Sequence, residues 1–181
     1  HLRKLGNRRP IRVWCSAAST GEEPYSIAIT VLETFGANTS HVSIVASDLD
    51  TNVLATAQKG VYPVERVEKL SPERLRRFFL RGTGAQEGFV SVRPELKSLI
   101  QFQRLNLLDA SYAVKGPLDV IFCRNVMIYF DKPTQYKILS RFAPLMQPDG
   151  LMFAGHSESF LHAADLFRSQ GKTVYTLASA R

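Results

Sequence analysis

Residues 118–130, LDVIFCRNVMIYF, decide the fold of this chain. The first six of them, 118–123, are mostly apolar, which predicts a buried parallel strand. The run then stops abruptly at Arg124 and Asn125, and Tyr129 follows one short loop later. Because ligands of open α/β sheets bind just beyond the carboxyl ends of the strands, these three side chains are expected to face a ligand.

The same strand-then-helix rhythm extends along most of the chain and predicts a parallel sheet with right-handed crossovers. A glycine-rich turn at 81–88 and an alternating segment interrupt it, which predicts a small antiparallel insert over about 61–98. Gln170-Gly171-Lys172 predicts a C-terminal hairpin over 167–177, and Gln147-Pro148-Asp149-Gly150 predicts a turn. The expected strands are 11–16, 42–47, 89–92, 99–105, 118–123 and 151–154; the expected helices are 24–35 (ended by Gly36), 51–59, 70–80 (capped by Ser71) and 133–142.

Length and composition limit the possible functions. A chain of 181 residues favours one main domain. The formal net charge of +7 favours an acidic partner, whether nucleic acid, a membrane surface or an acidic protein segment, or else serves solubility alone. The basic residues are scattered and no aromatic residues are interleaved with them, which argues against nucleic-acid binding. No apolar run is long enough to span a membrane and no signal peptide is visible, so we expect a cytoplasmic protein or a piece of one.

Cysteine and histidine usage predicts no metal site. Cys15 and Cys123 each lie near the end of a predicted buried strand, where a free cysteine usually acts as a small apolar residue. The four histidines show no ligand spacing with them.

The first strand is followed by a loop of small residues, 16–21, that lets a ligand approach the backbone closely. In dinucleotide-binding folds this loop holds a pyrophosphate, but Glu22 and Glu23 would repel phosphate here. A ligand with a positively charged amine suits these acids better. The alternative is that both acids simply favour the N-terminus of the following helix.

Three further strand ends carry polar groups. Asp48 is placed to bind ribose hydroxyls, or else it caps a helix, with Asp50 an equally good cap. Asn106 and Asp109 are placed to read an adenine edge, or else they are turn residues. We interpret His156-Ser157-Glu158 as shaping a loop, since no nucleophile elbow or triad order frames them. A nucleoside and an amine at one site fit S-adenosylmethionine better than NAD or ATP.

Several motifs, taken in order, resemble those of the chemotaxis receptor methyltransferases (the CheR type), S-adenosylmethionine-dependent protein-glutamate O-methyltransferases. The resemblance covers about 11–177, and the Cys-Arg-Asn and Gly-His-Ser-Glu blocks are the most specific. It implies an α/β Rossmann-like class I methyltransferase fold, a mostly parallel sheet with an antiparallel C-terminal hairpin and a small inserted antiparallel β-subdomain. The motifs are STGEEPYS (19–26), ASDLD (46–50), NLL (106–108), FCRNVMIYF (122–130) and PDGLMFAGHSE (148–158).

The resemblance also implies roles for particular residues. Glu23 would bind the amino group of the cofactor, with Glu22 as the alternative, and Asp48 would hold the ribose hydroxyls. Asn106 and Leu107 would border the adenine. The catalytic assignments are Arg124, which with Asn125 would line the cofactor and the incoming carboxylate, and Tyr129, which would position the substrate glutamate.

The family further implies a domain organisation and partners. Residues 1–10 would be a linker from an N-terminal helical domain that this chain lacks, and 11–181 the methyltransferase domain. The insert at about 61–98 would match the family's small β-subdomain, which in some members docks a short peptide at the C-terminus of the receptor, and its 81–84 loop resembles that of the peptide-docking members. The substrate would be glutamate side chains in the cytoplasmic domain of chemoreceptors, with S-adenosylhomocysteine as the product, and contact with the membrane would occur only through the receptor.

A methyltransferase of this kind needs no general base, because a glutamate with a pKa near ~4.3 is already ionised at neutral pH. Two other functions stay open at this point. One is a non-catalytic module that tethers a receptor or only binds the cofactor. The other is a nucleic-acid methyltransferase, which would need aromatic residues to hold a flipped base.

Overall fold

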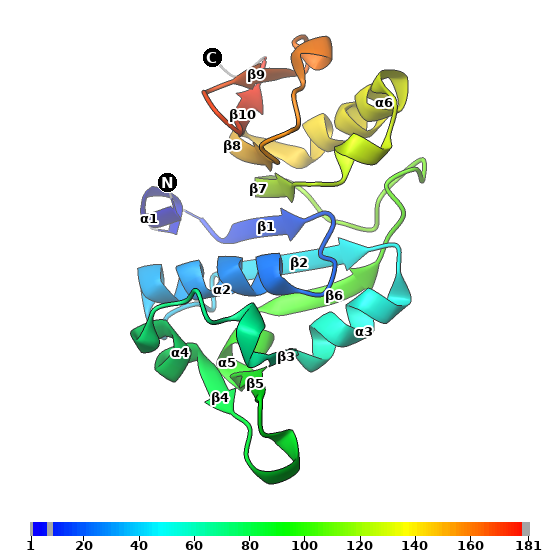
Figure 1. Ribbon diagram of the computed structural model, residues 1–181. Coiled ribbons are helices and arrows are strands. Elements are labelled where there is room, and N and C mark those ends of the chain that lie inside the picture. The colour runs from blue at the N-terminus through cyan, green and yellow to red at the C-terminus, as the bar shows by residue number, and fades with distance from the viewer. Residues whose placement is uncertain (1, 7–8, 179–181) are drawn as a thin grey trace.

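The computed structural model describes residues 2–6 and 9–178. Its main feature is a seven-stranded sheet with the order β6-β2-β1-β7-β8-β10-β9 (Figure 1). The first five strands in that order pair in parallel, and β10 pairs antiparallel with both β8 and β9. The strands are β1 (Ile11–Cys15), β2 (Val42–Asp48), β6 (Ile100–Arg104), β7 (Leu118–Cys123), β8 (Met146–Ala154), β9 (Phe167–Ser169) and β10 (Val174–Leu177).

The strand order reverses between β1 and β7. From β1 the chain moves outward through β2 to β6, and it then returns to place β7 on the other side of β1. The connections leaving β1 and β7 therefore diverge at the carboxyl edge of the sheet, which is where ligands bind in such folds.

Helices cover both faces of this sheet because alternate strand residues point to opposite faces. Val13 packs with α2 in one apolar cluster, whereas the adjacent Trp14 packs with α6 in the other. Within the described residues no helix combines the length and the apolar character needed to cross a membrane. The helices are α1 (Leu2–Gly6), α2 (Glu22–Phe35), α3 (Thr51–Lys59), α4 (Pro72–Phe78), α5 (Pro94–Lys97) and α6 (Lys132–Phe142).

A second, small antiparallel sheet has the order β3-β5-β4, with β3 (Val61–Pro63), β4 (Phe79–Arg81) and β5 (Phe89–Val92). It lies apart from the C-terminal hairpin, at the opposite end of the molecule (Figure 1). The predicted fold class is thus confirmed, including the C-terminal hairpin and the small inserted sheet.

Three elements differ from the sequence prediction by more than one residue at an end, whereas the other predicted strands and helices agree to within one residue. The helix expected over 70–80 ends at Phe78, because Phe79 turns to an extended conformation and pairs with Val92 in the small sheet. The turn expected at 147–150 lies inside β8, where the register shifts between the pairs Leu118–Met146 and Val120–Leu151. Helix α2 begins at Glu22, which leaves Pro24 within its first turn.

The predicted helix signals are confirmed at two places. Gly36 ends α2, where its N–H donates to the carbonyl of Leu32. Ser71 caps α4, where its hydroxyl accepts a hydrogen bond from the N–H of Arg74.

The amino edge of the sheet contains a buried carboxylate, Asp119, in an otherwise apolar strand. Its side chain is 1% exposed and its two oxygens accept bonds from the Arg9 guanidinium (2.8 and 2.9 Å) and the Arg12 N–H (2.8 Å). Arg9 also pairs with Asp149 in the β8 irregularity at 2.6 Å. One guanidinium thus ties the segment before β1 to β7 and β8.

We expect Asp119→Ala to lower the free energy of unfolding by about 2–3 kcal/mol, because it leaves the Arg9 cation and the Arg12 N–H without their acceptor. The matched control is Asp149→Ala, which removes a half-exposed carboxylate from the same arginine and should cost less than about 1 kcal/mol. Urea unfolding followed by circular dichroism measures both values. Equal losses in the two variants would contradict the assignment of Asp119 as the central acceptor.

Candidate functional site

A pocket of about 570 Å³ opens at the carboxyl edge of the sheet, where the connections after β1 and β7 diverge. It is large enough for a small-molecule ligand. The loop after β1, the end of β2 and the loop after β7 form its wall. The lining residues are Ala17, Ala18, Ser19, Glu22, Glu23, Asp48, Arg124, Asn125, Val126 and Tyr129.

The loop after β1 is held by its backbone. The N–H of Ser16 donates to the carbonyl of Phe122 at 2.9 Å, and the N–H of Ala18 donates to the carbonyl of Ser47 at 2.8 Å. Gly21 has φ +99°, and a Cβ there would lie 2.8 Å from both the Ala57 Cβ and the Tyr62 hydroxyl oxygen. Only glycine fits this position, so no side chain of residue 21 can stand between the loop and its neighbours.

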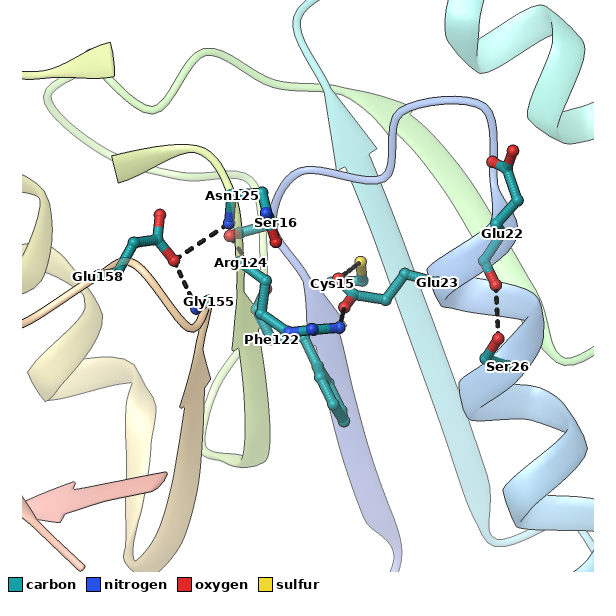
Figure 2. Close-up of polar contacts among 10 residues, drawn as sticks. All are labelled: Cys15, Ser16, Glu22, Glu23, Ser26, Phe122, Arg124, Asn125, Gly155 and Glu158. Carbon is teal, nitrogen blue, oxygen red and sulfur yellow. Dashed lines mark hydrogen bonds and ion pairs between the residues drawn. The ribbon is translucent and has the colours of Figure 1, made fainter. Parts of the chain in front are cut away.

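The two glutamates at the start of α2 have different environments (Figure 2). Glu23 points towards Arg124 and pairs with it, with 2.7 Å between Oε1 and Nη1, and the Cys15 thiol donates to Oε2 at 3.3 Å. The Glu22 carboxylate instead accepts from the Thr20 hydroxyl at 2.6 Å and lies 3.3 Å from Arg66. Of the two glutamates, Glu23 is therefore the one that pairs with a cation from the loop after β7.

Asp48, at the end of β2, is oriented by two backbone donors. Its Oδ2 accepts from the Ser19 N–H at 2.8 Å, and its Oδ1 accepts from the Asp50 N–H at 3.1 Å. The helix cap of α3 is Asp50, whose carboxylate accepts from Asn52 at 2.7 Å. Of the two sequence alternatives for a cap, Asp50 is thus the one found, and Asp48 faces the pocket.

The loop after β7 carries four pocket residues, Arg124, Asn125, Val126 and Tyr129. The Arg124 side chain is 38% exposed, Asn125 has φ +58°, and Tyr129 is 78% exposed at the pocket mouth. Asparagine tolerates this left-handed conformation better than most residues. The turn is stabilised from outside the pocket by Glu158, whose carboxylate accepts N–H bonds from the backbone of this loop (Figure 2). The interpretation of 156–158 as loop-shaping residues is confirmed for Glu158.

Two residues assigned from the sequence do not line this pocket. The amide oxygen of Asn106 accepts from the Leu108 N–H at 3.0 Å, as in a local turn. Leu107 is buried in the apolar cluster around Trp14. Both follow β6, which neighbours β2, so they lie one strand beyond Asp48.

Two residues that orient the acids of the pocket, Cys15 and Ser19, were not predicted from the sequence. Cys15 donates to Glu23, and Ser19 orients Asp48 through its backbone N–H. A main-chain donor has no residue-type signature, so nothing in the sequence marks Ser19. Cys15 lies near the end of the predicted first strand, but its contact with an acid eight residues later depends on the position of α2, which no local pattern gives.

The groups that meet in the pocket suit a ligand with several polar parts. Glu23 offers a carboxylate to a cation, Asp48 offers one to hydroxyls, and Arg124 offers N–H donors to an anion. Across residues 2–6 and 9–178, no group of three or more His, Cys, Asp or Glu residues is arranged to hold a metal ion.

Comparisons with known proteins found a matching family and close sequence relatives. Residues 1–176 match the family described as "CheR methyltransferase, SAM binding domain". The chain is 56% identical over 176 residues to "Chemotaxis protein methyltransferase 2" of Pseudomonas aeruginosa and 55% identical over 167 residues to "Chemotaxis protein methyltransferase" of Escherichia coli. These alignments cover 97% and 92% of this chain but 63% and 58% of the relatives, so the chain spans less than two thirds of their length.

Among solved structures, the fold resembles that of a TehB-like SAM-dependent methyltransferase from Corynebacterium glutamicum. The TM-score is 0.54 at 10% identity, and the match covers 97% of this chain and 83% of that one. At this identity the comparison supports the fold alone.

Both thiols should be unreactive in the folded protein. Burial raises the pKa of the Cys15 thiol well above its usual range, and the Glu23 carboxylate raises it further; burial raises the pKa of Cys123 to about 12. At pH 8 neither forms the reactive thiolate. Iodoacetamide labelling followed by mass spectrometry should modify both residues only after denaturation, when their pKa returns to ~8.5. Rapid labelling of native Cys15 would contradict the hydrogen bond to Glu23.

Proposed function

This chain belongs to the CheR methyltransferase family, and on that premise we propose that it transfers a methyl group from S-adenosylmethionine to glutamate side chains of chemoreceptors. The observation that carries the proposal is the pocket at the carboxyl edge, where Glu23, Asp48 and Arg124 meet. The names of the relatives, chemotaxis protein methyltransferases, support the same substrate class.

The residues of the pocket fit this cofactor. Glu23 would bind its amino group, since a carboxylate already paired with one cation at 2.7 Å keeps further acceptor sites for a second. Asp48 would hold the ribose hydroxyls, because its two backbone donors fix the carboxylate while leaving lone pairs free. Asn106 and Leu107 would border the adenine from the loop after β6, the strand next to the one that ends at Asp48, although neither lines the pocket itself.

When bound, the cofactor supplies a methyl group on a positively charged sulfur. Arg124 would attract the substrate carboxylate, because a guanidinium has five N–H donors and the bond to Glu23 uses one of them. Asn125 would line the same space. The substrate carboxylate is ionised at neutral pH, so the residues of the site need to align it and exclude water rather than remove a proton.

Tyr129 is the group best placed to orient the substrate. Tyr129 is 78% exposed and lines the pocket, so its hydroxyl is accessible to an incoming carboxylate. A hydroxyl bonded to a charged partner is worth about 1.5–3 kcal/mol.

The cofactor role of Asp48 can be tested by calorimetry with S-adenosylhomocysteine. We expect Asp48→Ala to weaken binding at least about tenfold, since it removes charged hydrogen bonds to the ribose hydroxyls. Asp50→Ala is the matched control, because it removes a carboxylate two residues away that caps α3. Unchanged affinity in Asp48→Ala, or an equal loss in both variants, would exclude the ribose role.

The activity itself can be tested with labelled S-adenosylmethionine and receptor-enriched membranes. We expect base-labile methyl esters on receptor glutamates, and Tyr129→Phe should reduce kcat roughly tenfold while leaving S-adenosylhomocysteine affinity within about twofold. Tyr136→Phe is the control, since this tyrosine lies on α6 and bonds Asp165 at the surface.

The same assay separates the other functions. Receptor binding without methyl transfer would instead identify a tethering or cofactor-binding module. Label in nucleic acid would identify a nucleic-acid methyltransferase. A Tyr129→Phe variant with the wild-type rate would remove Tyr129 from the site.

We further propose that the small sheet, within an insert of about 61–98, docks a C-terminal receptor peptide. A second pocket of about 610 Å³ lies on this sheet, and its wall combines apolar side chains with Arg76, Arg81 and Arg93. Strand β4 is at the edge of the small sheet, so an extended peptide can pair with it. Three guanidinium groups beside an apolar wall suit a peptide with an acidic residue and an apolar residue.

Arg81→Ala should weaken binding of this peptide at least about fivefold, because it removes a charge-assisted hydrogen bond. Fluorescence anisotropy with a labelled ten-residue peptide from a chemoreceptor C-terminus measures it. Arg168→Ala, on β9 in the other sheet, is the control for the loss of one positive charge. Equal binding by both variants would place the peptide elsewhere.

We also propose a domain organisation and a location that suit this function. Residues 11–181 would form the methyltransferase domain, and residues 1–10 would be the linker to an N-terminal helical domain. We propose a cytoplasmic location, with contact to the membrane only through the receptor.

A further inference from the structure

One carboxylate, that of Glu158, joins two loops behind the candidate site. Its Oε1 accepts from the N–H groups of Val126 (3.0 Å) and Met127 (2.8 Å). Its Oε2 accepts from the N–H groups of Asn125 (3.0 Å) and Gly155 (2.5 Å). The loop after β7 and the loop after β8 are thus held by the same side chain (Figure 2).

The environment of Glu158 is unusual for an acid. The residue is 8% exposed, and within residues 2–6 and 9–178 it forms no ion pair. Its charge is therefore balanced by four backbone N–H dipoles, a set that a neutral amide side chain cannot satisfy. A buried carboxylate used in this way orders the backbone around it.

The backbone that it orders has little freedom. Asn125 has φ +58°, a conformation that must be stabilised by its surroundings. A Cβ at Gly155 would lie 2.7 Å from the Glu158 Oε2 and 3.1 Å from the Asn125 nitrogen. The loops after β7 and β8 are therefore so close at Gly155 that a side chain there would collide with the Glu158 carboxylate.

A second side chain holds the other end of the same loop. The Gln135 amide donates to the carbonyls of Met127 (2.8 Å) and Phe130 (2.9 Å) from α6. Glu158 thus fixes the part next to Arg124 and Asn125, whereas Gln135 fixes the part that carries Tyr129.

The geometry points to Glu158 as a positioning residue of the methyl-transfer site, acting through the backbone of residues 125–127. This inference rests on the proposed function and adds a residue to it. Glu158 sets the direction in which Arg124 and Asn125 face the cofactor and the substrate carboxylate. It touches neither, and its effect is carried by the turn after β7.

Glu158→Gln is the main test, since it keeps the shape of the side chain and replaces one acceptor oxygen with an NH₂ group that faces N–H donors. We expect S-adenosylhomocysteine affinity to fall about tenfold by calorimetry and kcat to fall at least tenfold. Amide hydrogen exchange should become faster at residues 125–127 and 155 while the core of β1 and β7 stays protected. Asp165→Asn, a surface carboxylate a few residues later, should change none of these values.

Gln135→Ala separates positioning from simple loss of stability. It loosens residues 127–130 but leaves Glu158 in place, so kcat should fall while cofactor affinity stays within about twofold. Should Glu158→Gln not fold, Gly155→Ala displaces the carboxylate without removing it, and the same fall in affinity is expected.

The inference is overturned by wild-type affinity in Glu158→Gln, by unchanged exchange at 125–127, or by losses in both variants that simply follow their unfolding free energies. If the wild-type protein transfers no methyl group, the proposed function fails. Calorimetry and amide exchange still decide the role of Glu158 in that case.

Discussion

The ion pair between Glu23 and Arg124 joins the two halves of the sheet at the place where they diverge. Glu23 belongs to the helix after β1 and Arg124 to the loop after β7, and their charged atoms lie 2.7 Å apart. The reversed strand order makes this meeting possible, because two adjacent parallel strands send their connections in opposite directions. The pair is partly exposed, with 21% of Glu23 and 38% of Arg124 accessible, so its value lies in placing opposite charges side by side in the pocket rather than in stability.

The polar groups of the pocket are already oriented without a ligand, mainly by hydrogen bonds from backbone N–H groups. Ser19 and Asp50 fix the carboxylate of Asp48, and Glu158 collects the N–H groups of the turn after β7. Because its side chains are already ordered, such a site loses little conformational entropy when the ligand binds. The arrangement suits a reaction in which alignment and exclusion of water matter more than proton transfer.

Local signals predicted the parts of the fold that depend on local physics. The apolar run 118–123 with its abrupt polar end predicted β7 and the position of Arg124, and Gly36 and Ser71 predicted a helix end and a helix cap. Long-range pairing decided the rest. Phe79 follows a helical segment in the sequence but pairs with Val92 in the small sheet. The sequence of 147–150 predicts a turn, but this segment lies within β8, where Asp149 pairs with Arg9. The different environments of Glu22 and Glu23 likewise depend on Arg66 and Arg124, which no local pattern brings near.

The small sheet is attached to the pocket through the loop after β1, and this limits how each can change. The Tyr62 hydroxyl of β3 donates to the Thr20 carbonyl at 2.7 Å, and its oxygen occupies the space that a side chain at position 21 would need. Arg66, three residues after β3, lies 3.3 Å from the Glu22 carboxylate, whereas Glu23 pairs with Arg124. The insert therefore contributes to the shape and charge of the pocket at the carboxyl edge. It also carries the second pocket, on the small sheet. Removing the Tyr62 hydroxyl would therefore affect the insert and the turn at Gly21 together, because this hydroxyl bonds the Thr20 carbonyl and packs against Gly21.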